Sequence, residues 1–434
     1  MDQSMQGISS SSSTEEDRIY AKVGWRLIPF LVLCYLVSYL DRVNVGFAKL
    51  QMLKDLNLSD AVYGLGAGIF FLGYFLFEIP SNLILHRVGA KVWIARIMIT
   101  WGIISSAMMF TNSATTFYVL RFLLGAAEAG FFPGIVLYLT YWYPNARRGR
   151  MTTLFMLAVP LSGLIGGPIS GWIMSSFGGG AHGLAGWQWL YLLEGIPAII
   201  IGIVVLFYLD DRIEKAKWLT DSEKAMLARN IATENQSKEE PSVLVAMSMP
   251  RVWIMAFTYF AFVMGLYGVG FWMPSIIKGI GVNSTLEIGF LTAIPNLFAI
   301  IGMVLISRSS DRMRERRWHL AIPAVIGALG LIWSTSASGV VLAMTALTIA
   351  NIGIITVLPL LWSQPTAMLS GTAAAAGIAL INSVGNLAGF FSPSLVGWLK
   401  SVTGSTTSGM YLLAASLVVG ALLALSQPAK LVNK

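Results

Sequence analysis

Four ionisable residues interrupt otherwise apolar segments and are the strongest candidates for chemistry. Asp41 and Arg42 lie in one segment, and Arg121 and Glu128 lie in another. If these segments cross a bilayer, each charge costs at least ~2.5–3.5 kcal/mol near the centre, so each needs a physical role. A guanidinium stays protonated and its planar shape suits a carboxylate, whereas a buried carboxyl group can bind and release a proton. The four residues therefore predict an anion-binding pocket with proton-carrying acids.

Their spacing predicts how these residues meet. Arg121 and Glu128 are seven positions apart, nearly two helical turns, so they share one face. Arg42 points about 100° away from Asp41 and could reach Glu128 or a bound anion. At about 1.5 Å per residue, Asp41 lies about 10 Å and Arg121 roughly 6 Å below the same membrane face, which predicts an ion pair if their helices touch. Glu128 lies close to the midplane.

A purely structural alternative remains open. The same four residues could form two internal ion pairs that hold the two segments together, with no part in binding. The two interpretations are compatible, because an ion pair that breaks when a ligand binds is itself a coupling device.

Membrane-spanning helices must position these charges. Of the 434 residues, 56% are hydrophobic and only 12% are charged, too few to cover the surface of a soluble protein of this length. Lipid is therefore the expected solvent, and about 20 apolar residues are needed for each crossing. The sequence predicts about twelve spans, near 25–48, 61–85, 92–110, 117–141, 151–177, 187–209, 251–277, 286–307, 320–337, 339–362, 370–399 and 408–428.

One long polar stretch divides the chain into two six-helix halves. The predicted order is a disordered cytoplasmic tail (1–23), an amino-terminal bundle (24–209), a cytoplasmic linker (210–249), a carboxy-terminal bundle (250–428) and a short tail (429–434). Basic residues are concentrated in alternate loops, which favours a cytoplasmic location for both termini. The net charge of +8 is explained by these short loops and does not indicate nucleic-acid binding.

Faint similarities relate the two halves. Span 5 contains PISGW (168–172) and span 11 contains PSLVGW (393–398). The loop after span 2 reads HRVGAK (86–91), and its counterpart after span 8 reads DRMRERR (311–317). Duplicated halves with a ligand site between them are the usual plan of secondary transporters.

Other residue types exclude several classes of function. Cys34 is a single cysteine in an apolar run, and the three histidines are scattered, so neither a disulfide framework nor a metal site is expected. The sequence lacks the Gly-x4-Gly-Lys-Ser/Thr loop of an ATP-driven pump. It also lacks a nucleophile with its base, so we expect no enzymatic activity and no cofactor.

Weaker candidates could line a cavity or simply pack. They include the aromatic residues Tyr39, Tyr74, Trp272 and Trp362 and the amides Asn296, Asn351, Asn382 and Asn386. Packing is the default role of an aromatic ring, and hydrogen bonding between helices is the default role of an amide. Glu194 follows an interfacial aromatic cluster and is expected to be a structural partner.

The sequence resembles the major facilitator superfamily, and within it the anion:cation symporter family. The residues that carry the resemblance are SYLDRVN (38–44), RFLLGAAEAGFFPG (121–134), YWYPNARRGR (141–150) and WLYLLEGIP (189–197). The similarity extends over the chain after residue 20. The run PSNLILHRVG (80–89) is similar to the branch that contains tartrate, phthalate and hydroxyphenylacetate permeases.

The resemblance implies roles for individual residues. Asp41 and Glu128 would carry protons, Asp41 would pair with Arg121, and Arg42 would meet the substrate carboxylate. Tyr39, Tyr74, Trp362 and Asn382 fall where relatives contact substrate. The gating loops would be formed by His86, Arg87 and Gly89 in one half and by Asp311 and Arg312 in the other. The family usually carries an aspartate where His86 stands, which puts the first copy of the gating loop in doubt.

The resulting hypothesis is proton-coupled symport of a small organic carboxylate, by rocking of two bundles around a midplane site. Such a substrate would be a hydroxy acid such as tartrate or a hexonate, or an aromatic acid such as phthalate, nicotinate or hydroxyphenylacetate. An exchanger or proton-independent facilitator of the same fold is the alternative. The expected partners are this anion, protons and the lipid bilayer. The resemblance also implies a functional monomer in a bacterial inner membrane.

Overall fold

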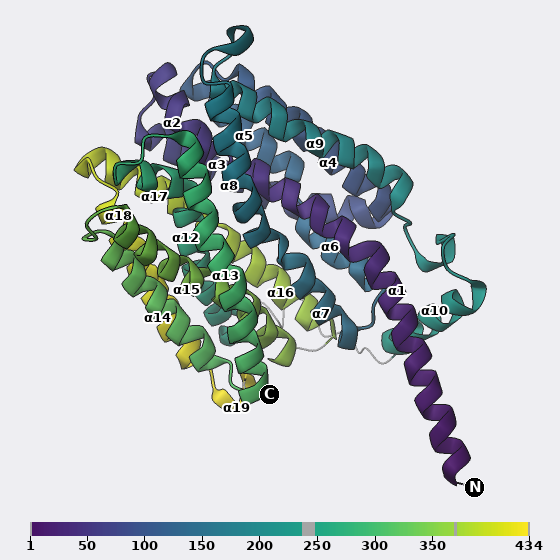
Figure 1. Ribbon diagram of the computed structural model, residues 1–434. Coiled ribbons are helices and arrows are strands. Elements are labelled where there is room, and N and C mark those ends of the chain that lie inside the picture. Colours follow the sequence, from purple (N-terminus) through teal and green to yellow (C-terminus); the bar gives the residue numbers. More distant parts are fainter. Residues whose placement is uncertain (1, 237–247, 369–370, 433–434) are drawn as a thin grey trace.

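A computed structural model describes residues 2–236, 248–368 and 371–432, and it is built from helices throughout (Figure 1). Within these ranges the chain forms no β-strand. The predicted all-α membrane fold is therefore confirmed. Both termini lie at the same end of the molecule, together with helix α10. We call this the linker end and the opposite one the far end.

The amino-terminal half contains nine α-helices. Their bounds are α1 (Asp2–Val43), α2 (Val45–Asp55), α3 (Asp60–Val88), α4 (Ala90–Ala107), α5 (Ala114–Glu128), α6 (Phe131–Thr140), α7 (Asn145–Met156), α8 (Ala158–Ser176) and α9 (Gly186–Tyr208). Short 3-10 turns follow α4 (η1, Met108–Phe110) and α8 (η2, Ala181–Gly183).

The linker contributes η3 (Ile213–Lys215) and α10 (Asp221–Gln236), and the carboxy-terminal half follows. Its described helices are α12 (Pro250–Gly279), α13 (Thr285–Met313), α14 (Arg317–Ser334), α15 (Val340–Met368), α16 (Gly371–Asn386), α17 (Ala388–Thr403), α18 (Thr407–Ser426) and α19 (Ala429–Val432).

Eleven helical segments of the described chain are long and apolar enough to cross a bilayer. They correspond to eleven of the twelve predicted spans. The predicted span at 370–399 corresponds to α16 and α17, which have 16 residues each and are separated at Leu387. Each of these two helices alone is shorter than a bilayer requires.

One span that the sequence predicted as continuous changes its backbone conformation part-way across, at Ala129–Gly130 between α5 and α6. Gly130 has a φ of 85°, a left-handed conformation that glycine adopts without steric cost. Asn44 and Leu157, which separate α1 from α2 and α7 from α8, keep right-handed helical dihedral angles. Discontinuous helices are common around the ligand sites of transporters.

The predicted tail (1–23) and the first predicted span fall on one helix. Helix α1 begins at Asp2 and continues into the membrane-spanning part. Ile19 and Tyr20 are buried, and Asp17 accepts a hydrogen bond of 2.6 Å from Arg147 of α7. These contacts supply the packing that the polar composition of the tail did not reveal.

The first part of the linker is attached to the amino-terminal half. The backbone N–H of Lys91, at the start of α4, donates a 3.0 Å hydrogen bond to Asp211. In α10, the carboxylate of Glu223 accepts from Lys22 of α1 at 2.8 Å. This bond lowers the pKa of Glu223, so the contact is present at neutral pH and is lost as pH falls through that lowered value.

The two halves meet at the far end through two equivalent glycine contacts. A Cβ atom on Gly64 of α3 would lie 3.0 Å from the Cα of Gly397 in α17. A Cβ atom on Gly171 of α8 would lie 3.0 Å from the Cα of Gly289 in α13. Gly171 and Gly397 belong to the repeated motifs PISGW and PSLVGW, so the repeat marks the places where backbone approaches backbone between the halves.

Polar contacts also join the halves at the far end. Asp60 of α3 pairs with Lys49 at 2.7 Å and with Lys400 of α17 at 3.2 Å. The Tyr63 hydroxyl donates a 2.7 Å hydrogen bond to the carbonyl of Phe271 in α12. Together with the glycine contacts, these bonds close the far end in this conformation.

The glycine contacts make a prediction about this closure. In Gly64→Leu, the side chain would collide with the carbonyl oxygen of Pro393, which cannot move independently of α17. We expect the halves to separate at the far end. Spin labels attached to Lys54→Cys and Val402→Cys, one in each half, should lie farther apart than in the parent protein. Double electron–electron resonance measures the distance between the two labels.

Gly179→Leu is the matched control, because a Cβ there meets nothing within 4 Å. Its distance distribution should equal that of the labelled parent protein. An unchanged distribution in Gly64→Leu would show that this contact does not hold the far end closed.

Candidate functional site

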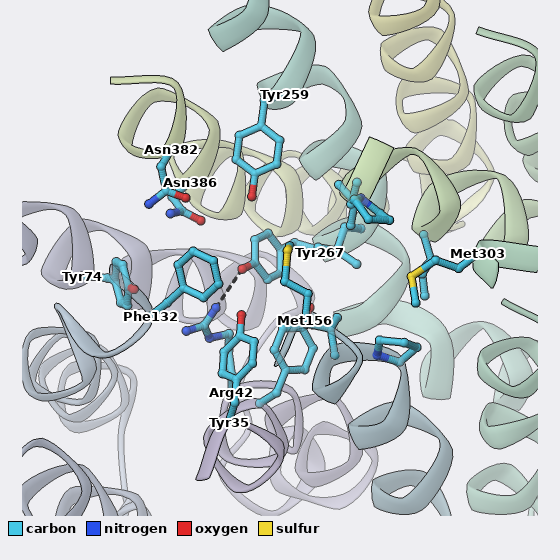
Figure 2. A pocket seen from close by; sticks show the side chains of 17 residues that line it. Tyr35, Arg42, Tyr74, Phe132, Met156, Tyr259, Tyr267, Met303, Asn382 and Asn386 are labelled. Carbon is cyan, nitrogen blue, oxygen red and sulfur yellow. Dashed lines mark hydrogen bonds between the residues drawn. The ribbon is translucent and has the colours of Figure 1, made fainter. Parts of the chain in front are cut away.

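A small cavity lies where the two halves meet (Figure 2). Its volume is about 50 Å³, enough for a few water molecules. The amino-terminal half contributes lining residues from α1, α3, α6, α7 and α8, and the other half contributes them from α12, α13, α15 and α16. The polar lining consists largely of Arg42, five tyrosines and two asparagines: Tyr35, Tyr39, Tyr74, Tyr259, Tyr267, Asn382 and Asn386.

The Arg42 guanidinium connects the two halves across this cavity. Its Nη2 atom donates to Oε1 of Glu128, which also accepts a 2.7 Å hydrogen bond from the Ser38 hydroxyl. Its Nη1 atom donates to the Tyr267 hydroxyl of α12 at 2.9 Å. Arg42 is 5% and Glu128 1% exposed, so the ion pair is shielded from bulk water.

Aromatic rings surround the same guanidinium. The Arg42 Cζ atom lies 5.5 Å from the ring centroid of Tyr39, 5.3 Å from that of Phe70 and 5.4 Å from that of Tyr74. Such cation–π contacts stabilise a cation that has lost its water. The cavity therefore contains a buried cation that has Glu128 as its counter-ion and whose Nε atom has no hydrogen-bond partner in the described part of the chain.

Asp41 is bonded to α4 and does not pair with Arg121, so the predicted Asp41–Arg121 ion pair is wrong for this conformation. Its carboxylate accepts hydrogen bonds of 2.8 Å from the Trp101 indole and 2.8 Å from the Ser105 hydroxyl. Asp41 is 1% exposed and does not line the cavity.

Arg121 is bonded to the backbone of α3 and also lies away from the cavity. Its Nε and Nη2 atoms donate to the carbonyl oxygens of Gly66 and Ala67 at 3.3 and 3.2 Å. A rise per residue gives the depth of a side chain but not the direction in which the helix turns it. The predicted pair failed for this reason, although both residues are buried as expected.

The remaining predicted substrate contacts divide into two groups. Tyr39, Tyr74 and Asn382 line the cavity beside Arg42. Trp362 stands behind the lining, with its ring centroid 5.0 Å from that of Tyr259.

The first predicted gating loop lies at the linker end, at a distance along α3 from the cavity. His86 and Arg87 are exposed in the last turn of α3, and Gly89 follows with a φ of 101°. No acid stands at position 86, but the start of α4 is hydrogen-bonded by Asp211 from the linker. A carboxylate at a helix N-terminus is stabilising, so the linker supplies the acid that the loop lacks.

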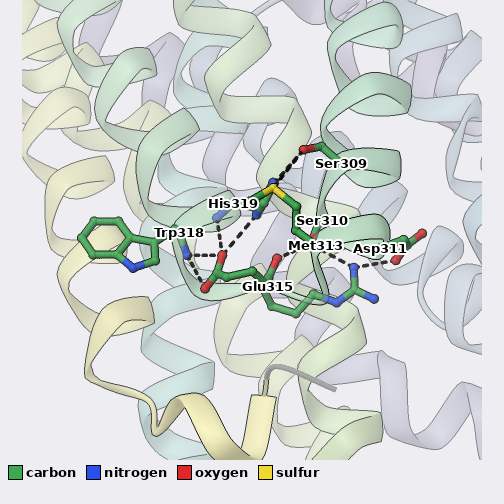
Figure 3. Close-up of polar contacts among 8 residues, drawn as sticks. Ser309, Ser310, Asp311, Met313, Glu315, Trp318 and His319 are labelled. Carbon is green, nitrogen blue, oxygen red and sulfur yellow. Dashed lines mark hydrogen bonds and ion pairs between the residues drawn. The ribbon is translucent and has the colours of Figure 1, made fainter.

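The second predicted gating loop carries its own acids (Figure 3). Asp311 pairs with Arg316 at 2.6 Å, while Arg312 is exposed. The Glu315 carboxylate accepts hydrogen bonds of 2.9 and 3.2 Å from two backbone N–H groups at the start of α14. In both halves a carboxylate therefore accepts hydrogen bonds from the N-terminus of the helix that follows the loop. In the second half this acid is Glu315 of the loop itself, and in the first half it is Asp211 of the linker.

Comparison with known proteins identifies the fold family. A sequence model of the Major Facilitator Superfamily matches residues 31–393. The chain belongs to this superfamily. The resemblance expected from the charged motifs is thereby confirmed, and the protein is a multi-pass membrane transporter rather than an enzyme.

Bacterial relatives of this superfamily member are similar over nearly the whole chain. A putative tartrate transporter of Agrobacterium vitis is 52% identical over 94% of this chain and 91% of its own length. The putative metabolite transport protein NicT of Pseudomonas putida is 51% identical over 96% of each chain. These relatives support a location in a bacterial inner membrane.

Solved structures share the fold at low sequence identity. The crystal structure of a D-xylose–proton symporter matches with a TM-score of 0.74 and 17% identity, over 93% of this chain and 98% of that one. A bacterial homologue of the human lysosomal transporter Spinster, in an inward-facing and unoccupied conformation, matches with a TM-score of 0.69 and 17% identity, over 92% of this chain and 94% of the other.

Sequence reasoning missed several residues that hold the charged side chains at and beside the cavity. Trp101 and Ser105 hold Asp41, and Tyr267 holds Arg42. Trp101 and Ser105 are four positions apart and share one helical face, which is a usable signal for a common partner. A tyrosine such as Tyr267 gives no such signal, because most membrane aromatics only pack. Among the described residues, no cluster of histidine, cysteine and acidic side chains could hold a metal ion.

The Asp41 contacts predict the effect of removing a donor. Trp101→Phe deletes the indole N–H and leaves one oxygen of a buried carboxylate unpaired, which should reduce the free energy of unfolding by about 1–3 kcal/mol. Thermal unfolding of the detergent-purified protein would measure the loss. Trp398→Phe alters an exposed tryptophan and should have little effect. Equal stability of the two variants would contradict a role for Trp101 in holding Asp41.

Proposed function

We propose that this transporter takes up a small organic carboxylate together with a proton, by alternating access. The observation that carries the proposal is the buried Arg42 guanidinium, which faces the central cavity while bonded to Glu128. An arginine provides a permanent positive charge for the substrate carboxylate. The neighbouring glutamate provides a group that can be ionised or neutral.

Competition for Arg42 would couple the two ligands. An entering carboxylate displaces Glu128 from the guanidinium, since both anions use the same donors. A buried carboxylate without its cation is costly, so Glu128 binds a proton at this stage. When that proton leaves on the other side of the membrane, ionised Glu128 returns to Arg42 and expels the substrate. Anion and proton therefore travel together.

Asp41 is proposed as the second proton-carrying acid. It precedes Arg42 in the chain, and its carboxylate is buried between α1 and α4. A carboxylate buried in this way is a group that can carry a proton in its neutral form. Asp41 stays apart from the substrate, because Trp101 and Ser105 hold it outside the cavity lining.

The direction of opening follows from the distribution of charge and contacts. The basic residues concentrate in the loops at the linker end, which favours the cytoplasmic side for that end. The far end, which is closed in this conformation, would then face the outside. The glycine contacts between the halves would separate there when the transporter opens to the outside.

The substrate class is supported by the cavity and by the relatives. Tyrosine hydroxyls and asparagine amides beside Arg42 suit a small polar anion. Since a putative tartrate transporter is 52% identical, we propose a hydroxy acid such as tartrate or a hexonate, with aromatic carboxylates as the other candidates. The cavity must widen from this conformation to admit any of them, because its volume of about 50 Å³ has room for only a few water molecules.

Glu128→Gln tests proton coupling. The glutamine cannot carry a proton through the cycle, so net proton-driven uptake should fall by more than tenfold. The measurement uses proteoliposomes, a pH-sensitive dye inside them, and labelled tartrate. Wild-type uptake should acidify the lumen. Uptake by Glu128→Gln at the wild-type rate would contradict symport, and wild-type uptake that requires an internal anion would indicate an exchanger instead.

Arg42→Ala tests anion recognition and needs a companion substitution. Alone, it would leave Glu128 charged and unpaired at a cost of about 3–5 kcal/mol, so Arg42→Ala should be combined with Glu128→Gln. The double variant should remain folded yet show no thermal stabilisation by the hydroxy or aromatic acid that best stabilises the wild type. Glu128→Gln alone should still bind. Equal binding by both variants would show that Arg42 is structural.

A further inference from the structure

A buried glutamate lies beside the cavity, with no role so far. Glu78 belongs to α3, one helical turn from Tyr74 toward the linker end, and is 5% exposed. Its Oε1 atom accepts a 2.9 Å hydrogen bond from Nδ2 of Asn382. Asn382 lies on α16 in the other half and lines the cavity. The contact therefore joins a carboxylate outside the lining to an amide within it.

The chemistry of this bond determines which way the amide points. An ionised carboxylate can only accept hydrogen bonds, so Asn382 must turn its NH2 group toward Glu78. The opposite orientation would bring two oxygen atoms together.

Two further observations show that the amide is committed to this orientation. The second carboxylate oxygen of Glu78, Oε2, is buried and has no partner, so Asn382 provides the side-chain hydrogen bond that this carboxylate receives. None of the described residues donates a hydrogen bond to Oδ1 of Asn382. This atom is also not fully buried, so a ligand can reach it. Oδ1 is therefore the free acceptor that Asn382 presents on the cavity side (Figure 2).

We propose that Glu78 is a positioning residue that selects hydroxycarboxylates by fixing the Asn382 amide oxygen toward the substrate. This inference rests on the proposed function, with the substrate carboxylate on Arg42. A hydroxyl group of the same substrate donates to Oδ1 of Asn382. A site built to bond a hydroxyl discriminates against the analogue that lacks it, because the acceptor is then buried without a partner.

Tartrate and succinate test this selection, because they share a carbon chain and two carboxylates and differ only in two hydroxyls. Binding to the purified protein in detergent would be measured by calorimetry. The wild type should bind tartrate more tightly. Glu78→Gln is close in shape and can pair with Asn382 in either amide orientation, so the preference should fall roughly three- to tenfold, as expected for one hydrogen bond.

A double-mutant cycle separates positioning from mere stabilisation. Asn382→Ala should lower the preference by itself, and adding Glu78→Gln should change it no further, because Glu78 acts through Asn382. The matched control is Glu194→Gln, another buried glutamate, whose carboxylate bonds Ser170 and does not line the cavity. The preference of Glu194→Gln for tartrate over succinate should equal that of the wild type.

The outcomes distinguish this inference from the proposed function. Succinate binding as tight as tartrate binding in the wild type, or an unchanged preference in Glu78→Gln, overturns the role of Glu78 and leaves carboxylate transport standing. Binding of neither acid, with no stabilisation by any carboxylate tested, overturns both. A loss of preference that also appears in Glu194→Gln would overturn the inference, since the effect would then follow from removing any buried charge.

Discussion

The structure depends on one ion pair buried between apolar helices, Arg42 with Glu128. Neither charge is tolerable alone at this depth, because removing one partner leaves the other without solvent or counter-ion. The pair is completed by a hydroxyl from Ser38 and by Tyr267 from the opposite half. Because Tyr267 belongs to the other bundle, the electrostatics of the site and the position of the two halves are linked in one set of bonds.

The fold places the acid of this pair where a helix is interrupted. Glu128 is the last residue of α5, and the break that follows at Gly130 uses a conformation that only glycine adopts freely. A carboxylate is disfavoured at a helix C-terminus, where the carbonyl groups carry partial negative charge. Glu128 therefore depends on Arg42 of α1 as its counter-ion.

Much of the fold could be predicted from the sequence, because lipid imposes simple rules on composition and helix length. Eleven of the spans and the burial of all four central charges followed from those rules. The repeat around Gly171 and Gly397 was visible as well, although its meaning as a pair of close backbone contacts required coordinates. The contacts of Ile19 and Tyr20 could not be predicted, since the composition around them is polar.

The charged residues of the candidate site could be predicted, but the directions in which their side chains point could not. Helical periodicity left Arg42 either Glu128 or a bound anion as its partner, and the structure pairs it with Glu128, 86 positions away in the chain. It could not show that Asp41 turns to α4 or that Arg121 turns to carbonyl groups of α3, because those choices depend on which neighbours approach closely. The glycines of α3 allow that approach, and their effect on the direction of a distant side chain is not readable from one sequence.

The attachment of the linker has a mechanical consequence. Asp211 and α10 are bonded to α4 and α1, so this part of the connection belongs to the amino-terminal bundle. A tilt of one bundle against the other therefore carries Asp211 and α10 along with α1 and α4, as one body with the amino-terminal half.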